Sequence, residues 1–303
     1  MVTRVATFAL SEQMLASTLA AQARMAELQQ QEATGAKSTD FGGLGAAAKR
    51  VIDLQVSVDR AQSYIDGATT ADSRIQVMYS ACGSMTDLLT QLRSLLTGAS
   101  DSATTDSASV TVSAQEMMQE FASLLNTQYD GRYVFGGART DQLPVTISDP
   151  PYAVATSPTS ADTSYYSGDH GIASVRVSDQ QVIDYGVTAD ESGFEQALRA
   201  FNLVANTSPL DTTTLNEAMG LAESALSDIT TAQTRLSLAS AAVERASSYQ
   251  TEYQDYARSL GSDLNGVDVA AVTAQLSTYQ AQLEASYSAI SKIQSLNLAD
   301  YLR

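Results

Sequence analysis

Cysteine, histidine and tryptophan are almost missing from this sequence of 303 residues. One cysteine, Cys82, rules out an internal disulfide and a cysteine cluster for zinc or an iron–sulfur centre. One histidine, His170, leaves little for a zinc site or a histidine-based catalytic triad. We therefore predict no catalytic residues, no metal and no cofactor. We expect Cys82 to be a small buried side chain on a helix, and His170 to lie in a glycine-rich turn.

Basic residues and long apolar runs are also scarce. The chain has 17 Lys and Arg against 34 Asp and Glu, a net charge of −17. Such a charge opposes binding to nucleic acid and to anionic lipid surfaces, so we expect neither partner. No run approaches the ~20 apolar residues of a membrane span, and residues 1–5 lack the pattern of a cleaved secretion signal. If the protein leaves the cytoplasm, we expect its N-terminus to remain intact.

Long helices are what the remaining composition favours. Much of the apolar content is alanine, accompanied by Gln, Ser, Leu and Glu, which is typical of helices packed side by side. Apolar or small residues recur in steps of three and four, the spacing of one helix face. The longest such stretch follows heptads over residues 51–96, and Asp72, Thr86 and Arg93 interrupt one of its two rows. The other periodic stretches are 10–28, 110–124, 215–243 and 269–293, and helix also resumes near Phe194.

Glycines, prolines and short alternating runs mark the breaks between these helices. Breaks are predicted at Gly35, 42–45, Gly98 with 100–109, 260–261 and 265–266. Strands are predicted at 132–135, 172–177 and 182–187. Four of the five prolines fall between residues 144 and 158, which is typical of loops and edge strands.

We therefore predict a mainly α fold, a long antiparallel helical bundle or coiled coil of N- and C-terminal segments with a small β-rich insertion. Three domains are expected. Residues 1–40 with 262–303 form a terminal coiled coil. Residues 41–139 with 193–261 form a helical bundle with a β-hairpin, and residues 140–192 form a β-rich domain.

The two terminal segments carry the functional prediction. A helix that buries one narrow stripe needs a partner, and these segments are each other's nearest candidates. Their pair still leaves apolar flanks, such as Phe8, Leu15, Leu19, Tyr287 and Leu298. We expect the flanks to be buried by assembly with further subunits; the alternative is that the ends close the bundle of a monomer. The side chains predicted at this interface are Phe8, Leu10, Met14, Leu28, Val272, Leu276, Tyr279, Leu283, Ile290, Ile293, Leu298 and Leu302.

Several segments resemble one known family over nearly the whole chain. They are residues 29–37, 46–96, 126–141, 266–270 and 296–302, and the sharpest is the hairpin motif Gly131, Arg132, Tyr133, Val134, Phe135, Gly136 and Gly137. On these residues the chain resembles the bacterial flagellin superfamily, and within it the hook–filament junction proteins (hook-associated protein 3), with major flagellins second. Residues 33–45 depart from the pattern of both, and the usual flagellin signature after the first helix is absent.

The resemblance implies a structural subunit of the bacterial flagellum, not an enzyme. It implies type III export with an export chaperone, a secreted, extracellular location, and a homo-oligomer in a helical lattice. It also implies a place between hook-associated protein 1 and the flagellin filament. In that place, residues 1–40 with 262–303 would be the axial, inner domain, and residues 140–192 the outer domain. A flagellin subunit of the filament is the alternative. A secreted binding or enzymatic protein is the third reading. Asp169, His170 and nearby carboxylates are its only candidate residues for polar chemistry, and no spacing in the sequence singles out a carboxylate pair for acid–base catalysis.

Overall fold

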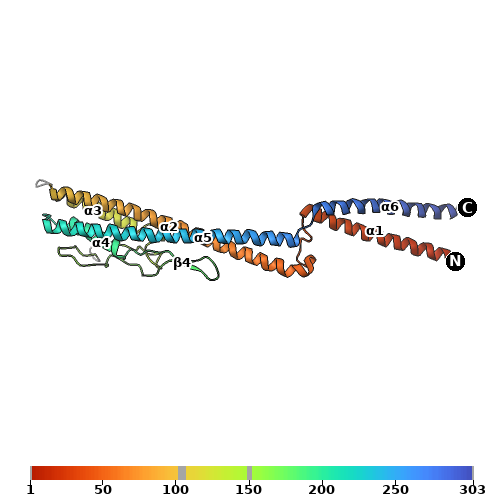
Figure 1. The fold of residues 1–303 in the computed structure, drawn as a ribbon, viewed down its shortest axis with the longest axis horizontal. Helices are drawn as coiled ribbons and strands as arrows, with labels where there is room; N and C mark the ends of the chain where they lie inside the picture. The colour runs from red at the N-terminus through yellow and green to blue at the C-terminus, as the bar shows by residue number, and fades with distance from the viewer. Residues whose placement is uncertain (1, 102–106, 149–151, 302–303) are drawn as a thin grey trace. The chain divides into compact units, whose positions relative to one another are not determined.

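The computed structural model describes residues 2–101, 107–148 and 152–301, with side chains for residues 12–100, 107–148 and 152–292. It contains long helices joined by loops and four short strands (Figure 1). The elements are α1 (Val2–Thr34), the 3₁₀ helix η1 (Gly42–Ala47), α2 (Ala48–Asp101), α3 (Ser107–Leu125), β1 (Gln128–Tyr129), β2 (Arg132–Tyr133), β3 (Ser174–Arg176), β4 (Val182–Asp184), α4 (Ser192–Asn206), α5 (Thr212–Asn265) and α6 (Val269–Tyr301).

Two compact units make up the chain. The terminal unit is Met1–Arg60 with Tyr253–Arg303, and the central unit is Ala61–Glu252. Helices α2 and α5 each contribute residues to both units. The predicted mainly α fold with a small β-rich insertion is confirmed, whereas the predicted three-domain division remains a prediction.

One predicted helix break is wrong, because Gly261 lies inside α5. The break predicted at Gly98 with 100–109 begins slightly later than expected: Gly98 lies inside α2, which ends at Asp101, and α3 begins at Ser107. A single glycine costs a helix only about 0.5–1 kcal/mol relative to alanine. The buried neighbours Leu96 and Ala257 hold the helix on its packed face at each place, so the propagating helix continues through both glycines.

Helices α2 and α5 run antiparallel in the central unit, and polar pairs mark their register. Ser240 Oγ donates to Asp72 Oδ1 at 2.5 Å, and Arg93 Nη2 lies 3.2 Å from Glu223 Oε1. Two of the three polar interruptions in the heptads are therefore partners of α5. The third, Thr86, donates to a backbone carbonyl of its own helix.

Side chains from α2 and α5 fill the central core together, with many alanines among those from α5. Large and small side chains together fill the space at the density typical of protein interiors. The fully buried α2 side chains are Ile75, Met78, Cys82, Met85, Leu89, Leu92 and Leu96, and the α5 side chains include Ala218, Ala222, Ala225 and Ile229. Cys82 is buried as predicted, and burial raises the pKa of its thiol to about 12.

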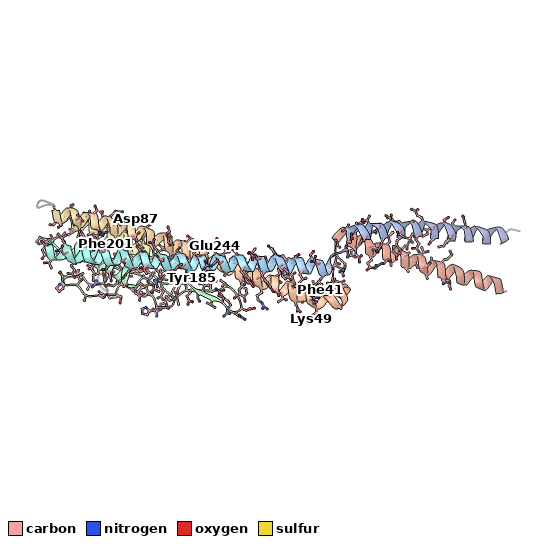
Figure 2. All side chains as sticks on the ribbon, viewed as in Figure 1. Phe41, Lys49, Asp87, Tyr185, Phe201 and Glu244 are labelled. Atoms are coloured by element: carbon pink, nitrogen blue, oxygen red, sulfur yellow. The ribbon has the colours of Figure 1, made fainter. Side chains whose placement is uncertain are left out.

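Four of the six phenylalanines complete this core. The ring of Phe121 from α3 lies 5.5 Å, centroid to centroid, from that of Phe201 in α4. Phe201 is labelled in Figure 2. Phe135 packs edge-on against Phe194 at 5.8 Å. Aromatic pairs at these separations add to the burial of their area, so they fix α4 against α3 and against the end of the hairpin motif.

The strands are shorter than predicted. β1 and β2 form an antiparallel hairpin, and β3 and β4 pair from Ser174–Asp184 to Arg176–Val182. Val134 and Phe135 belong to no strand, and their side chains are buried in the core. Most of the described part of the insertion outside β3 and β4 is irregular backbone.

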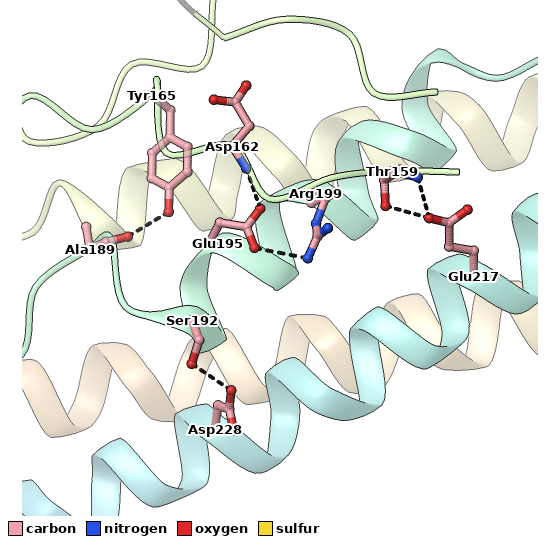
Figure 3. Close-up of polar contacts among 9 residues, drawn as sticks. All are labelled: Thr159, Asp162, Tyr165, Ala189, Ser192, Glu195, Arg199, Glu217 and Asp228. Carbon is pink, nitrogen blue, oxygen red and sulfur yellow. Dashed lines mark hydrogen bonds and ion pairs between the residues drawn. The ribbon is translucent and has the colours of Figure 1, made fainter. Parts of the chain in front are cut away.

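The carboxylates of Glu195, which is buried, and Glu217, which is half-buried, hold that irregular backbone on α4 and α5 (Figure 3). Glu195 Oε1 accepts from the Asp162 amide at 3.0 Å, and its other oxygen pairs with Arg199 at 3.1 Å. Glu217 Oε1 accepts from both the amide and the hydroxyl of Thr159. The two carboxylates thus supply hydrogen-bond acceptors for backbone amides that belong to no strand, and backbone amides removed from water need acceptors.

Candidate functional site

Helices α1 and α6 lie side by side in the terminal unit (Figure 1). Thr273 near the start of α6 donates to Glu32 near the end of α1 at 2.8 Å, and Gln22 donates to Tyr287 farther along. The helices are therefore antiparallel, and the start of α1 lies beside the end of α6. Each has 33 residues, which corresponds to about 50 Å of helix.

The seam between them is narrow. Among the described side chains of this pair, the buried hydrophobic ones are Leu28, Val272, Leu276 and Leu283. Thr18 is also buried, but its hydroxyl bonds to a carbonyl of its own helix. Because isolated helices are marginal in water and tertiary packing supplies most of their stability, four aliphatic side chains are a small seam for two helices of this length.

Apolar side chains remain on the flanks of the pair. Leu15 is 55% exposed, Leu19 is 56% exposed and Tyr287 is 48% exposed. The flanks predicted from these three residues therefore face solvent in the single chain. Exposed apolar side chains grouped on one element mark surfaces that bind another protein.

The terminal pair is also nearly uncharged. α1 carries Arg4 and Arg24 against Glu12, Glu27 and Glu32, and α6 carries Lys292 against Glu284 and Asp300. Each helix thus has one excess negative charge in a chain of net charge −17. Copies of this surface repel each other far less than copies of the remaining surface.

The predicted interface residues fall into three groups. Leu28, Val272, Leu276 and Leu283 are buried in the seam, and Met14, Tyr279 and Ile290 are half-buried. Phe8, Leu10, Ile293 and Leu298 lie on α1 or α6, but their side chains are outside the described ones. Leu302 lies outside the described residues.

A joint between the ends of α1 and α5 was not predicted. The amide of Lys37 donates to the Asn265 carbonyl at 2.6 Å, and the Val267 amide donates to the Gly35 carbonyl at 3.0 Å. The Asn265 side chain bonds to both the amide and the carbonyl of Ser38. The two chain breaks are therefore tied together where both terminal helices meet the rest of the terminal unit.

Helix-capping chemistry sets where these breaks occur. Gly35 has φ +67°, a left-handed conformation that ends α1. The ammonium of Lys37 donates to the Leu264 carbonyl at 2.9 Å, placing a cation at the C-terminus of α5. The Asp268 carboxylate accepts from the amides of Ala270 and Ala271 and caps the start of α6. Asn-Gly and Asp signals at 265–268 were visible in the sequence, but their pairing with residues 35–38 was not.

The residues of the hairpin motif, from Gly131 to Gly137, mostly make contacts within the chain. Gly131 has φ +70° in the tight turn between β1 and β2. Tyr133 donates its amide to the carbonyl of Thr140, and Phe135 is buried. Arg132 is exposed.

The two glycines that end the motif pack against the loop that contains Asp169. A Cβ on Gly137, which has φ +69°, would lie 2.2 Å from the Asp169 carbonyl oxygen, and one on Gly136 would lie 2.7 Å from the Arg139 carbonyl oxygen. Only glycine fits such approaches. The motif therefore joins the end of α3, the insertion and α4.

The polar residues singled out for chemistry also have structural partners. The Asp169 carboxylate accepts from the Ala138 and Gly171 amides at 2.7 and 2.8 Å, and these bonds lower its pKa. His170 is exposed, and its Nδ1 lies 2.7 Å from Asp190 Oδ2. In the described part of the chain, no three His, Cys, Asp or Glu side chains gather as a metal site. No helix of that part is both long and apolar enough for a membrane span.

Two family models match the chain. The N-terminal helical region of bacterial flagellin matches residues 5–140, and its C-terminal helical region matches residues 219–302. Comparison with curated proteins gave no match.

Solved structures of the same fold include two flagellar proteins. One, from Vibrio parahaemolyticus and described as a flagellar hook-associated protein, has 14% identity and a TM-score of 0.62; the match covers 72% of this chain and 97% of that one. The other, flagellar hook-associated protein 3 of Legionella pneumophila, has 13% identity and a TM-score of 0.55; the match covers 70% of this chain and 98% of that one.

Proposed function

Because this chain belongs to the bacterial flagellin family, we propose that it is the subunit that joins the flagellar hook to the flagellin filament. Membership of the family makes it a structural component of the flagellum. In the proposed role it binds hook-associated protein 1 on one side and flagellin on the other, and it has no catalytic activity.

The observation that carries the proposal is the terminal helix pair. Its seam buries four described aliphatic side chains, while Leu15, Leu19 and Tyr287 stay exposed on nearly uncharged helices. Burial of an aliphatic side chain contributes about 1.5–3 kcal/mol. Further copies that cover these flanks would supply the burial that a single chain lacks. The pair is therefore the proposed assembly interface, and a helical lattice of copies is the proposed oligomer.

The junction is favoured over the filament by two points. The hairpin motif from Gly131 to Gly137 resembles that of junction proteins more than that of flagellins. The two solved structures of shared fold are themselves described as flagellar hook-associated proteins. A flagellin subunit is the second candidate because the matching family models are those of flagellin.

The proposal includes how the subunit reaches its place. We propose export through the flagellar type III apparatus, with an export chaperone that protects the apolar flanks of the terminal helices, and a secreted, extracellular final location. Residues 1–40 with 262–303 would then form the axial domain. Residues 41–139 with 193–261 would surround it, and residues 140–192 would face outward.

Immuno-electron microscopy on intact flagella tests the proposal. We expect a single labelled band at the hook end of each filament. Label along the whole filament would favour the flagellin alternative, and flagella without label would refute both. Deletion of the gene gives an independent measure: hooks that shed unpolymerised flagellin are expected, whereas a shortened or altered filament would contradict the junction role.

A further inference from the structure

A pocket lies on the side of α5 in the central unit, where the β3–β4 hairpin approaches the helix. Its volume is about 260 Å³. Ala242, Arg245, Ala246 and Tyr249 line it from α5, and Val177 and Gln181 line it from the hairpin. We call this the Arg245 pocket. The buried Gln250 amide donates to the Val177 carbonyl at 2.9 Å, so the hairpin wall is fixed to the helix.

In the described part of the chain, at least six helix cations pair with a carboxylate. Some find it one turn away on the same helix, as in the pairs Lys49–Asp53 and Arg199–Glu195. Arg93 has no acidic residue at that spacing, and it pairs with Glu223 of another helix.

Arg235, like Arg93, pairs with a carboxylate outside its own helix, whereas Arg245 does not. Arg235 also lacks an acidic residue at that spacing, and it pairs with Glu191. The positions one turn from Arg245 are Ala241, Ala242, Ser248 and Tyr249. Within the described chain, Arg245 is exposed and makes no hydrogen bond or ion pair.

We propose that the Arg245 pocket binds an aspartate or glutamate side chain of a second copy of this chain. The proposal rests on the proposed function, in which copies lie beside one another. Charge complementarity selects the occupant, since each copy carries two acidic residues for every basic one and this guanidinium has no internal partner. The α5 residues that line the pocket, 242–250, lie within the helix and not at either end, as a contact between lateral neighbours requires.

The surroundings of Arg245 suit such a contact. Tyr249 is 66% exposed. Its ring and the two alanine side chains that line the pocket would shield a bound carboxylate from water. The attraction between the two charges strengthens as water is excluded. Arginine and tyrosine are also the side chains most enriched at the centres of protein interfaces.

Photo-crosslinking in assembled flagella tests the proposal. The full chain carries p-benzoylphenylalanine in place of Tyr249, flagella are isolated and irradiated, and the products are identified by mass spectrometry. We expect a dimer of the chain attached within a few residues of an Asp or Glu. The same photo-probe at Thr251, which is exposed and lies roughly 160° around α5 from Tyr249, is the control and should give at least fivefold less of this product.

A charge reversal supplies the second arm. Arg245→Glu, combined with the probe, should reduce the dimer at least fivefold per assembled copy, whereas the same reversal at the exposed Arg50 should not. If Arg245→Glu keeps the chain out of flagella, Arg245→Gln replaces it. A crosslink only to a different protein, no crosslink, or equal loss from both reversals would overturn the proposal. None of these outcomes changes the position of the labelled band, so failure here is distinguishable from failure of the junction role.

Discussion

Replacing Leu283 by aspartate tests the terminal helix pair most directly. Leu283 is 5% exposed on α6, so the change removes apolar burial of about 1.5–3 kcal/mol. It also places a carboxylate in the seam, where an unpaired charge costs several kcal/mol more. Of the described seam only Leu28, Val272 and Leu276 then remain buried, and we expect α1 and α6 to separate.

Two assays follow the separation. In cells, the variant should be exported at the normal level, measured by immunoblot of the culture medium, and swimming should be lost. In the purified chain, hydrogen exchange should show partial amide protection in the wild-type helices 12–34 and 269–292 and none in the variant. Amides of the central core should be protected equally in both proteins.

Leu238→Asp is the matched control. It makes the same chemical change on α5, but Leu238 is 66% exposed, so motility should be retained. Normal swimming of Leu283→Asp and of Ile290→Asp would refute the role of the seam. Full protection of α1 and α6 in the wild-type monomer would refute the argument that assembly completes their folding.

Four further substitutions test other parts of the molecule. Asn265→Ala removes both side-chain bonds to Ser38; a local loss of about 1–2 kcal/mol is expected, seen as faster amide exchange at residues 35–38. Gly137→Ala must adopt a left-handed φ and clash with a carbonyl oxygen, so urea unfolding should show a loss of at least about 2 kcal/mol. Gly98→Ala, with nothing near its Cβ, should instead stabilise by about 0.5–1 kcal/mol; losses of equal size would contradict the packing argument. Hydrogen bonds from Ser157 and Thr159 lower the pKa of Glu217, so its stabilisation is complete above the ordinary glutamate pKa of 4.5 and is lost as the pH falls through the lower folded value. Glu217→Gln should therefore flatten the acid side of the stability–pH curve. An unchanged acid side would be evidence against a stabilising role for the hydrogen bonds to Glu217.

The helices were predictable because their signal is local and repeats. Residues 51–96 repeat apolar positions over many turns, and the start of α4 at Ser192 lies close to the predicted resumption near Phe194. The exposed flanks at Leu15 and Leu19 followed from the same periodicity. Each of these features depends on spacing within one element, which a single sequence displays directly.

Two features were not predictable because they depend on partners far away in the chain. They are the joint between the ends of α1 and α5, and the hydrogen bonds from the insertion to Glu195 and Glu217. Lys37 and Asn265 are 228 positions apart by their numbers, and nothing local to either one indicates the other. Glu195 reads as an ordinary surface charge of a helix until the loop at Asp162 is placed on it. Gly261 failed as a break signal for the converse reason, since packing of the neighbouring helix turn outweighs a local cost of about 1 kcal/mol.

The burial of Cys82 has a practical consequence for experiments on this protein. Thiol-reactive probes attack the thiolate, and a pKa of about 12 leaves very little thiolate near neutral pH. Close packing also denies a bulky maleimide or nitroxide reagent access to the sulfur. A cysteine introduced at an exposed position is therefore labelled selectively with the native thiol left in place. Spin-label or fluorophore pairs on α1 and α6 would then report the separation of the two helices in solution and in the assembled organelle.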